Sequence, residues 1–390
     1  MKITKVEVMV LRMPDSEMMK VPTNLFSTTE YLYYRDGNEE AALIRIETDE
    51  GIEGIGELST LGTVVESVIH APPQATWWRG WDEILVGQDP LEVGYLWDRM
   101  YRESGLYGGR GFITTVMSGI DCALWDIAGK YYKQPVYRLL GGGGAGTATP
   151  YMSFSRFGKT EEEIIERCEK VKRSNYRAVK FHNHPIGMDD KKALKFVELA
   201  RNQLGDGIDI MLDAAEHYHD AKEAIKFARG IEPFNPYFFE AALSEDDLDG
   251  YAKLSDATSV KIAAGEGQTT RYLCRELLEK GKIDILQPDT NWSGGITELM
   301  RMGRMANDMG RLLIPHTYKS YVGLASNLHV SASLPNSPYC EAPTSPLPLA
   351  VNLTNEKIVP EADGKIHLSE RPGLGVTLNK ETVEKYRFVW

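Results

Sequence analysis

The chain has 390 residues, which is long enough for a large core and a second unit but too short for four domains. Its net charge is −12, so neither nucleic acid nor an anionic membrane surface is an expected partner. Hydrophobic residues make up 42% and charged residues 26% of the chain, which is typical of a globular protein. An anionic substrate would therefore need positive charge at its own binding site, from side chains or from a metal ion.

The cysteines and the first residues bear on the cellular location. The four cysteines are scattered and form no Cys-x-x-Cys pair, so we expect no disulfide framework, and the reducing cytoplasm is the default. The stretch MKITKVEVMVLRM alternates like a strand and lacks the long apolar core of a signal peptide. No stretch approaches the length of a membrane span. We therefore expect a cytoplasmic protein that does not bind a membrane.

The first third of the chain predicts an α+β unit. Residues 2–12 alternate as a strand does, and residues 41–57 predict a hairpin that turns at residues 49–51. Helical patterns follow at about 91–103 and 114–132. The tail of the chain (350–390) has no further alternation of strands and helices, and we expect it to rejoin this unit.

Beyond residues 141–144, short apolar strands alternate with amphipathic helices. The eight expected strands start 24 to 31 residues apart and cover 149–154, 177–182, 208–214, 236–243, 260–266, 284–289, 312–318 and 339–343. Parallel strands need crossover connections, usually helices, and about 200 residues of such units fit a closed (β/α) barrel. An open, doubly wound sheet is the competing architecture.

Ionisable residues lie at the end of every expected strand from the second to the eighth. In chain order they are Lys180 with His182, Asp213, Glu240, Glu266, Asp289, His316 and Glu341. The carboxyl ends of barrel strands form the active-site mouth. The arrangement that makes the chain a barrel therefore also gathers these groups around one mouth.

Three successive strands each contribute one carboxylate, namely Asp213, Glu240 and Glu266. Three converging carboxylates without a partner would repel each other and lose their hydration, and a divalent cation removes both penalties. An all-oxygen ligand set favours Mg²⁺, with Mn²⁺ as an alternative. The competing interpretation is that each acid caps the helix that follows it.

The remaining groups are suited to moving protons. Asp289 and His316 lie on neighbouring strands, where the carboxylate would fix the imidazole tautomer and raise its basicity. Lys180 and His182 share one face of their strand, opposite Val179 and Phe181. Because each cation disfavours protonation of the other, we expect one of them to be neutral and able to act as a base near pH 7.

The chain resembles the enolase superfamily, in its mandelate-racemase-like branch, over nearly its whole length. The motifs that carry the resemblance are MSGIDCALWDIAGK, MLDAAEHY, FFEAAL, AAGEG, ILQPDTNWSGG and IPHTY. The resemblance implies an α/β protein with a modified (β/α)₇β TIM-type barrel over residues 141–349. It also implies an α+β capping domain made of residues 1–140 and the tail.

The resemblance also implies roles for single residues. Asp213, Glu240 and Glu266 match the magnesium ligands of the family, and Asp289 with His316 matches its His-Asp dyad. Lys180 matches the first lysine of a Lys-x-Lys motif in which His182 replaces the second. Glu341 matches a carboxyl that hydrogen-bonds the substrate carboxylate, and Ser153 is a further candidate contact to that carboxylate.

The function that the resemblance implies is abstraction of the proton α to the carboxylate of a small-molecule substrate. Our reading is dehydration of a sugar acid to a 2-keto-3-deoxy acid by a homo-oligomer, with capping-domain loops at 14–35 and 57–60 selecting the substrate. A racemase or epimerase of a hydroxy or amino acid is the alternative, and the histidine in place of the second lysine weighs against it. A zinc barrel hydrolase using His182, His184, His217 and Asp289, or a non-catalytic binding protein, are more distant alternatives.

Overall fold

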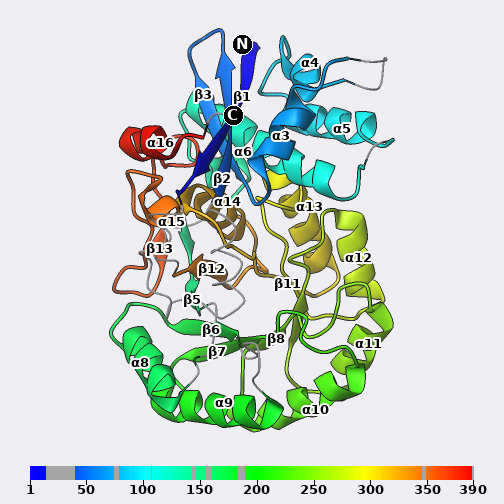
Figure 1. The fold of residues 1–390 in the computed structure, drawn as a ribbon, viewed down its shortest axis with the longest axis vertical. Coiled ribbons are helices and arrows are strands. Elements are labelled where there is room, and N and C mark those ends of the chain that lie inside the picture. Colours follow the sequence, from blue (N-terminus) through cyan, green and yellow to red (C-terminus); the bar gives the residue numbers. More distant parts are fainter. Residues whose placement is uncertain are drawn as a thin grey trace.

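The structure is a computed structural model, and Figure 1 shows an upper unit that contains the N-terminus above a lower barrel. The residues that it describes are 1–14, 40–73, 79–106, 108–142, 146–154, 158, 160–182, 189–344 and 348–388. His184 and nearly all of the expected specificity loop at 14–35 lie outside these ranges. No helix among the described residues is long and apolar enough to cross a membrane.

The upper unit is an antiparallel sheet with helices packed on it. Its strands follow the order β1 (Ile3–Arg12), β2 (Glu40–Thr48) and β3 (Glu53–Leu58), which confirms the expected hairpin. Its helices are α3 (Gly62–Ile69), α4 (Trp81–Leu85), α5 (Val93–Glu103) and α6 (Phe112–Tyr132). Helix α6 packs directly on β3, because a Cβ at Gly56 would lie 2.0 Å from the carbonyl oxygen of Gly119.

The lower unit is a parallel sheet of eight strands with a helix in each connection. Its strands are β5 (Pro150–Phe154), β6 (Ala178–His182), β7 (Asp209–Asp213), β8 (Phe238–Glu240), β9 (Ile262–Ala264), β10 (Ile285–Leu286), β11 (Leu312–Leu313) and β12 (Cys340–Pro343). Its helices are α8 (Glu161–Lys172), α9 (Asp190–Leu204), α10 (Ala221–Ile231), α11 (Leu248–Ala257), α12 (Arg271–Glu279), α13 (Gly295–Asp308) and α14 (Tyr321–Ser331). All eight expected strands are present, and the (β/α)₇β order is confirmed.

The strand order excludes the doubly wound alternative. Strands β5 to β11 are neighbours in chain order, and β12 returns to pair with β5. A doubly wound sheet would instead reverse its order at a switch point. The two end strands also meet, because the backbone N–H of Glu341 donates to the carbonyl of Pro315 at 3.3 Å. The sheet therefore curls around an interior.

Side chains alternate between the inside and the outside of the curled sheet. One interior layer combines a residue from seven strand positions: Tyr151, Ala178, Met211, Phe238, Ala263, Ile285 and Ile314. Val179 and Phe181 instead belong to the outer core that the helices cover. Lys180 and His182 continue the face of Ala178, so they point inward, as the alternation of their strand predicts.

Strands β10 and β11 end earlier than their sequence patterns predict. The expected strands 284–289 and 312–318 contain Pro288 and Pro315, which have no N–H to continue a ladder. The two proline segments still touch, because the N–H of His316 donates to the carbonyl of Pro288 at 3.2 Å. Asp289 and His316 therefore stand on short loops just above their strands.

The tail contacts both units. After α15 (Pro348–Asn352), strand β13 (Ile366–His367) pairs with β4 (Thr147–Ala148), which directly precedes the first strand of the barrel. Beyond α16 (Lys380–Tyr386), the N–H of Phe388 donates to the carbonyl of Val10 at 2.8 Å, and Figure 1 shows α16 beside the upper sheet. The short helices α7 (Val136–Leu139) and η2 (Glu232–Phe234) complete the described elements. The domain bounds 1–140 with 350–390, and 141–349, stay a prediction.

Two buried carboxylates of the upper unit bind the amino-terminal ends of barrel helices. Asp121 on α6 accepts the N–H of Thr297 at 2.8 Å at the start of α13. Glu57 on β3 accepts the hydroxyl of Ser320 at 2.7 Å and the N–H of Gly323 at 2.9 Å at the start of α14. Unpaired N–H groups and the helix dipole favour a carboxylate at both places. The expected substrate-selecting segment at 57–60 thus begins with an inter-unit anchor.

The buried imidazole of His329 gives a stability prediction. Its Nδ1 accepts the N–H of Tyr137 at 3.1 Å and its Nε2 lies 3.2 Å from the carbonyl oxygen of Leu374, which fits the neutral ring. Burial lowers the pKa of His329 to about 4. The unfolded chain therefore takes up this proton first, so stability is lost as the pH falls from about 6.5 to 4, by on the order of 3 kcal/mol.

We expect His329→Gln, which keeps an acceptor and a donor, to lose less unfolding free energy than the wild type between pH 8 and pH 5. Urea titrations followed by circular dichroism measure this difference. The matched control is His367→Gln, on an exposed strand of the tail, which should follow the wild type. An equal pH dependence in the wild type and His329→Gln would contradict the prediction.

Candidate active site

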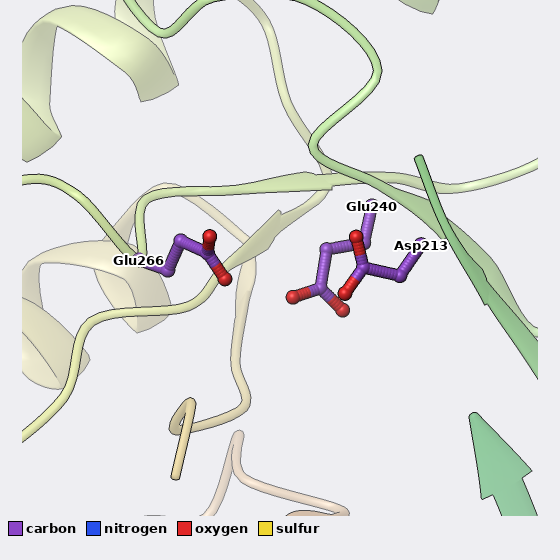
Figure 2. Close-up of side chains that lie close together, drawn as sticks. All are labelled: Asp213, Glu240 and Glu266. Carbon is purple, nitrogen blue, oxygen red and sulfur yellow. The ribbon is translucent and has the colours of Figure 1, made fainter. Parts of the chain in front are cut away.

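Three carboxylates meet at the carboxyl edge of the barrel. Asp213 ends β7, Glu240 ends β8, and Glu266 follows β9 by two residues. One oxygen of each carboxylate lies within 4.8 Å of the others, and Figure 2 shows Glu266 pointing towards the pair formed by Asp213 and Glu240. The side chains of Asp213 and Glu240 are 3% and 1% exposed, whereas that of Glu266 is 39% exposed. Two of the three carboxylates are therefore buried, and the third, Glu266, is accessible to solvent.

The backbone turns sharply just after the first two of these carboxylates. The N–H of Ala214 donates to Glu240 O and that of Ala241 to Ala263 O, both at 3.0 Å, so the ladder runs up to the carboxylates. Within three residues of Asp213 and Glu240, the backbone of Ala215, Glu216 and Ala241 has φ of 47°, 56° and 45°. A residue with a side chain is disfavoured in this left-handed conformation by about 1–2 kcal/mol. The strained residues thus lie directly beside the proposed site.

Lys180 lies at the centre of the buried negative charge. Its Nζ is 2.9 Å from both oxygens of Glu240, 3.1 Å from Asp213 Oδ2 and 3.0 Å from Glu341 Oε1. Burial disfavours the charged lysine, but Glu240, Glu341 and Asp213 outweigh it and hold its pKa well above the usual range. Lys180 is therefore charged near pH 7, and the expectation that one of the two groups is neutral can hold only for His182.

His182 is also held by a carboxylate. Its Nε2 lies 3.0 Å from Asp213 Oδ2, and its side chain is 33% exposed. Burial lowers its affinity for a proton, but the charge of Asp213 and the bond to it prevail over burial and over Lys180, and raise its pKa. The repulsion between Lys180 and His182 is thus real but smaller than the attraction of the carboxylates, which the local sequence did not reveal.

Asp289 and His316 are paired as the sequence predicts. His316 Nδ1 lies 3.1 Å from Asp289 Oδ2, and its Nε2 lies 3.5 Å from Glu266 Oε2. Burial opposes the charged imidazole, but Glu266, Glu341 and Asp289 together raise the pKa of His316 to about 10. Asp289 thus holds Nδ1, and Nε2 of His316 faces the carboxylate cluster.

Two asparagines that the sequence reading missed hold the dyad. Asn327 Nδ2 lies 3.0 Å from Asp289 Oδ1 and 3.1 Å from the carbonyl oxygen of His316. Asn291 donates to the same Asp289 oxygen from its backbone N–H at 2.9 Å and from its side chain at 3.0 Å. Asn291 lies two residues after Asp289 in ILQPDTN, but Asn327 lies inside α14, where no local pattern marks it.

Glu341 lies between the lysine and the dyad. Its Oε1 binds Lys180, while its Oε2 accepts the N–H of Thr317 at 3.0 Å and lies 3.9 Å from His316 Nε2. Ser153 on the neighbouring strand also hydrogen-bonds Glu341, and Lys180 and His316 lower the pKa of this buried carboxyl. The structure thus brings together the described residues predicted for the magnesium-dependent site: Ser153, Lys180, His182, Asp213, Glu240, Glu266, Asp289, His316 and Glu341. His217, named for the zinc alternative, is not in the group placed to hold a metal.

The donor set fits a hard divalent cation. Burial and the charges of Asp213, Glu341 and Glu266 raise the pKa of Glu240 to about 8 although Lys180 opposes the shift, so the cluster lacks positive charge. Within the described ranges, Asp213, Glu240 and Glu266 are the group of three placed to hold a metal, and it contains no histidine. Oxygen ligands suit Mg²⁺ or Mn²⁺ better than Zn²⁺.

Two family models match the chain. The model described as enolase C-terminal domain-like matches residues 163–382. The model described as mandelate racemase / muconate lactonizing enzyme, N-terminal domain, matches residues 10–141. Together they match most of the upper unit, the barrel strands from β6 onwards and most of the tail.

Curated relatives and solved structures agree with these matches. The arabinonate dehydratase of Saccharolobus solfataricus is 32% identical over 354 residues, which cover 89% of this chain and 91% of that enzyme. The D-galactonate dehydratase of Pectobacterium atrosepticum is 31% identical and covers 87% and 89%. The 3,6-anhydro-D-galactonate cycloisomerase from Zobellia galactanivorans has a TM-score of 0.85 and 29% identity, with 100% of both chains covered. A racemase from Streptomyces coelicolor with bound magnesium has a TM-score of 0.84 and 25% identity, covering 99% and 100%.

We expect Asn327→Asp to slow turnover by about 10²-fold, because a second carboxylate beside Asp289 would compete for the dyad proton and weaken the base. Steady-state kinetics measure the loss. The matched control is Asn336→Asp at the opposite end of the barrel, where the amide donates to the carbonyls of Gly303 and Arg311 at 3.0 Å. This control should lower the melting temperature but keep the turnover of the folded enzyme. If the two variants kept equal turnover, Asn327 would have no role in supporting the His-Asp pair.

Proposed function

Because the chain belongs to the enolase superfamily, in its mandelate-racemase-like branch, we propose that it is a magnesium-dependent dehydratase that converts a sugar acid to a 2-keto-3-deoxy acid. The observation that carries the proposal is the meeting of three carboxylates and a His-Asp pair at one barrel mouth. Asp213, Glu240 and Glu266 would hold the cation. A bound Mg²⁺ would supply the positive charge that makes the proton α to a carboxylate removable.

His316 is the proposed base for that proton. Asp289 binds Nδ1 and leaves Nε2 directed at the carboxylate cluster, where the substrate carboxylate would lie. The negative charge of Glu266 now holds a proton on His316. Neutralising that charge would lower the pKa of the imidazole towards the range in which a general base works at neutral pH.

Departure of the 3-hydroxyl needs an acid, and His182 is the proposed donor. Its imidazole stands beside Asp213, at the end of the carboxylate group opposite to His316. His316 takes the proton from C2, and the hydroxide leaves C3 as water with the proton that His182 donates, so the substrate loses one water overall. The enol that remains becomes the 2-keto-3-deoxy acid. Lys180 stays charged and offsets the buried carboxylates, which keeps an anionic substrate tolerable at this mouth.

Racemisation or epimerisation is the second candidate, because two imidazoles flank the carboxylate group. Such a reaction needs a base on each face of the α-carbon. The bond of His182 to Asp213 also permits a third outcome, in which His182 only orients the metal ligand. These three roles of His182 make different predictions.

The named relatives support the choice of substrate class. Arabinonate and D-galactonate dehydratases are among them, so five- and six-carbon sugar acids are the first substrates to test. Formation of a 2-keto acid on such a panel, followed by proton NMR of the product, distinguishes dehydration from epimerisation. The proposed assembly is a homo-oligomer, which light scattering on the purified protein measures.

For the metal, we expect Glu240→Gln to weaken Mg²⁺ binding by more than about 100-fold, because even an outer partner of a ligand changes affinity by about 10–100-fold. Turnover should be lost while the circular dichroism spectrum is kept. Isothermal titration calorimetry with Mg²⁺ gives the affinity. Glu276→Gln on the exposed face of α12 is the matched control. Near-normal Mg²⁺ affinity in Glu240→Gln would show that the metal site is assigned wrongly.

For the proton transfer, we expect Asp289→Asn and His316→Asn to lose about 10²–10⁴-fold in turnover, which is the scale of a lost general base. In deuterated water, His316→Asn should not exchange the substrate α-proton if His182 is only an acid. Exchange in that variant would identify His182 as a second base and favour the racemase. Unchanged turnover in His182→Ala would leave His182 with a structural role beside Asp213.

A further inference from the structure

Glu266 differs from the other two carboxylates in how its backbone is held. It lies between Gly265 and Gly267, and Gly265 has φ of 119°, so the chain has left the β-ladder there. Glycine has more conformational freedom to lose than any other residue. The side chain of Glu266 is also the most exposed of the three. Something other than a strand must therefore fix this ligand.

Glu245 makes the contacts that fix it. This residue follows β8, and its side chain is buried. Its Oε1 accepts the N–H of Gly265 at 2.6 Å and lies 3.4 Å from the N–H of Gly267, so one carboxylate holds the chain on both sides of Glu266. On the opposite side, Trp292 Nε1 donates to the carbonyl of Gly267 at 3.1 Å.

The two contacts join the segment after β8 to the segment that carries Glu266, so the position of Glu266 depends on Glu245. The same gap between β8 and β9 is bridged at the other end of the barrel by Glu232, whose Oε1 accepts the N–H of Ser259 at 2.8 Å. Only the Glu245 bridge lies beside a proposed metal ligand.

We infer that Glu245 is a positioning residue that sets the Mg²⁺ affinity of the site by orienting Glu266. The inference rests on the proposed function, because it assumes that Glu266 is a ligand. Glu245 does not itself join the proposed ligand set of Asp213, Glu240 and Glu266.

Calorimetry with Mg²⁺ on the full-length protein tests the inference without reference to activity. Glu245→Ala should weaken Mg²⁺ binding by about 10–100-fold, the usual effect of losing an outer partner of a ligand. Turnover should recover as the Mg²⁺ concentration is raised, because all three ligands are still present. Glu245→Gln, which keeps an oxygen acceptor, should restore most of the affinity.

The matched control is Glu232→Ala, which removes the same kind of bridge far from the site. It should lower the melting temperature and leave the Mg²⁺ affinity unchanged. Trp292→Phe removes the other tether of the Gly267 segment and should also weaken Mg²⁺ binding, which covers the case in which Glu245→Ala does not fold.

The outcomes separate the two levels of the proposal. Normal Mg²⁺ affinity in both Glu245→Ala and Trp292→Phe, with weak binding in Glu266→Gln, would overturn the role of Glu245 alone. Normal affinity in Glu266→Gln would overturn the metal site itself. Equal loss of affinity in Glu245→Ala and Glu232→Ala would show a general effect of stability and overturn the positioning role.

Discussion

Repulsion between buried carboxylates is the constraint that the rest of this structure has to meet. Five carboxylates, four of them buried, surround three basic side chains at the barrel mouth, namely Asp213, Glu240, Glu266, Asp289 and Glu341 around Lys180, His182 and His316. Two like charges about 4 Å apart repel by about 4 kcal/mol at an effective dielectric constant of about 20. Lys180 offsets only part of this, as the raised pKa of Glu240 shows. The proposed divalent cation would balance this charge, and its positive charge would also allow a protein of net charge −12 to bind an acid.

The upper unit is attached at the loops that carry the proposed base. Asp121 binds the start of α13, which follows Asp289, and Glu57 binds the start of α14, which follows His316. Burial alone would disfavour both carboxylates, and it raises the pKa of Asp121 to about 7. The N–H groups at the helix amino termini offset this cost by donating hydrogen bonds to the two carboxylates. The attachment therefore fixes the upper unit relative to the His-Asp pair.

The sequence predicts most of this site because its information is local. Each strand ends an apolar run with one ionisable residue, so the barrel register alone gathers Asp213, Glu240 and His316. The early ends of β10 and β11 were missed, although Pro288 and Pro315 mark them. Contacts that join distant segments could not be read in this way. Asn327 reaches Asp289 across 38 positions, and the cations were misjudged because Lys180 meets Glu240 only in three dimensions.

The rim of the barrel changes its construction from one strand to the next. Between β7 and β8 the backbone ladder reaches the carboxylates, so Asp213 and Glu240 are held by the fold itself. At β9 the ladder stops short of Glu266, and Glu245 holds that segment. Between β10 and β11 the backbone bond from His316 to Pro288 remains, and Asn327 adds a side-chain contact to Asp289. A backbone link cannot be altered without disturbing the barrel, whereas a side-chain link can change by one substitution. The half of the site that carries Glu266 and the proposed base therefore depends more on side-chain contacts than the half that carries Asp213 and Glu240.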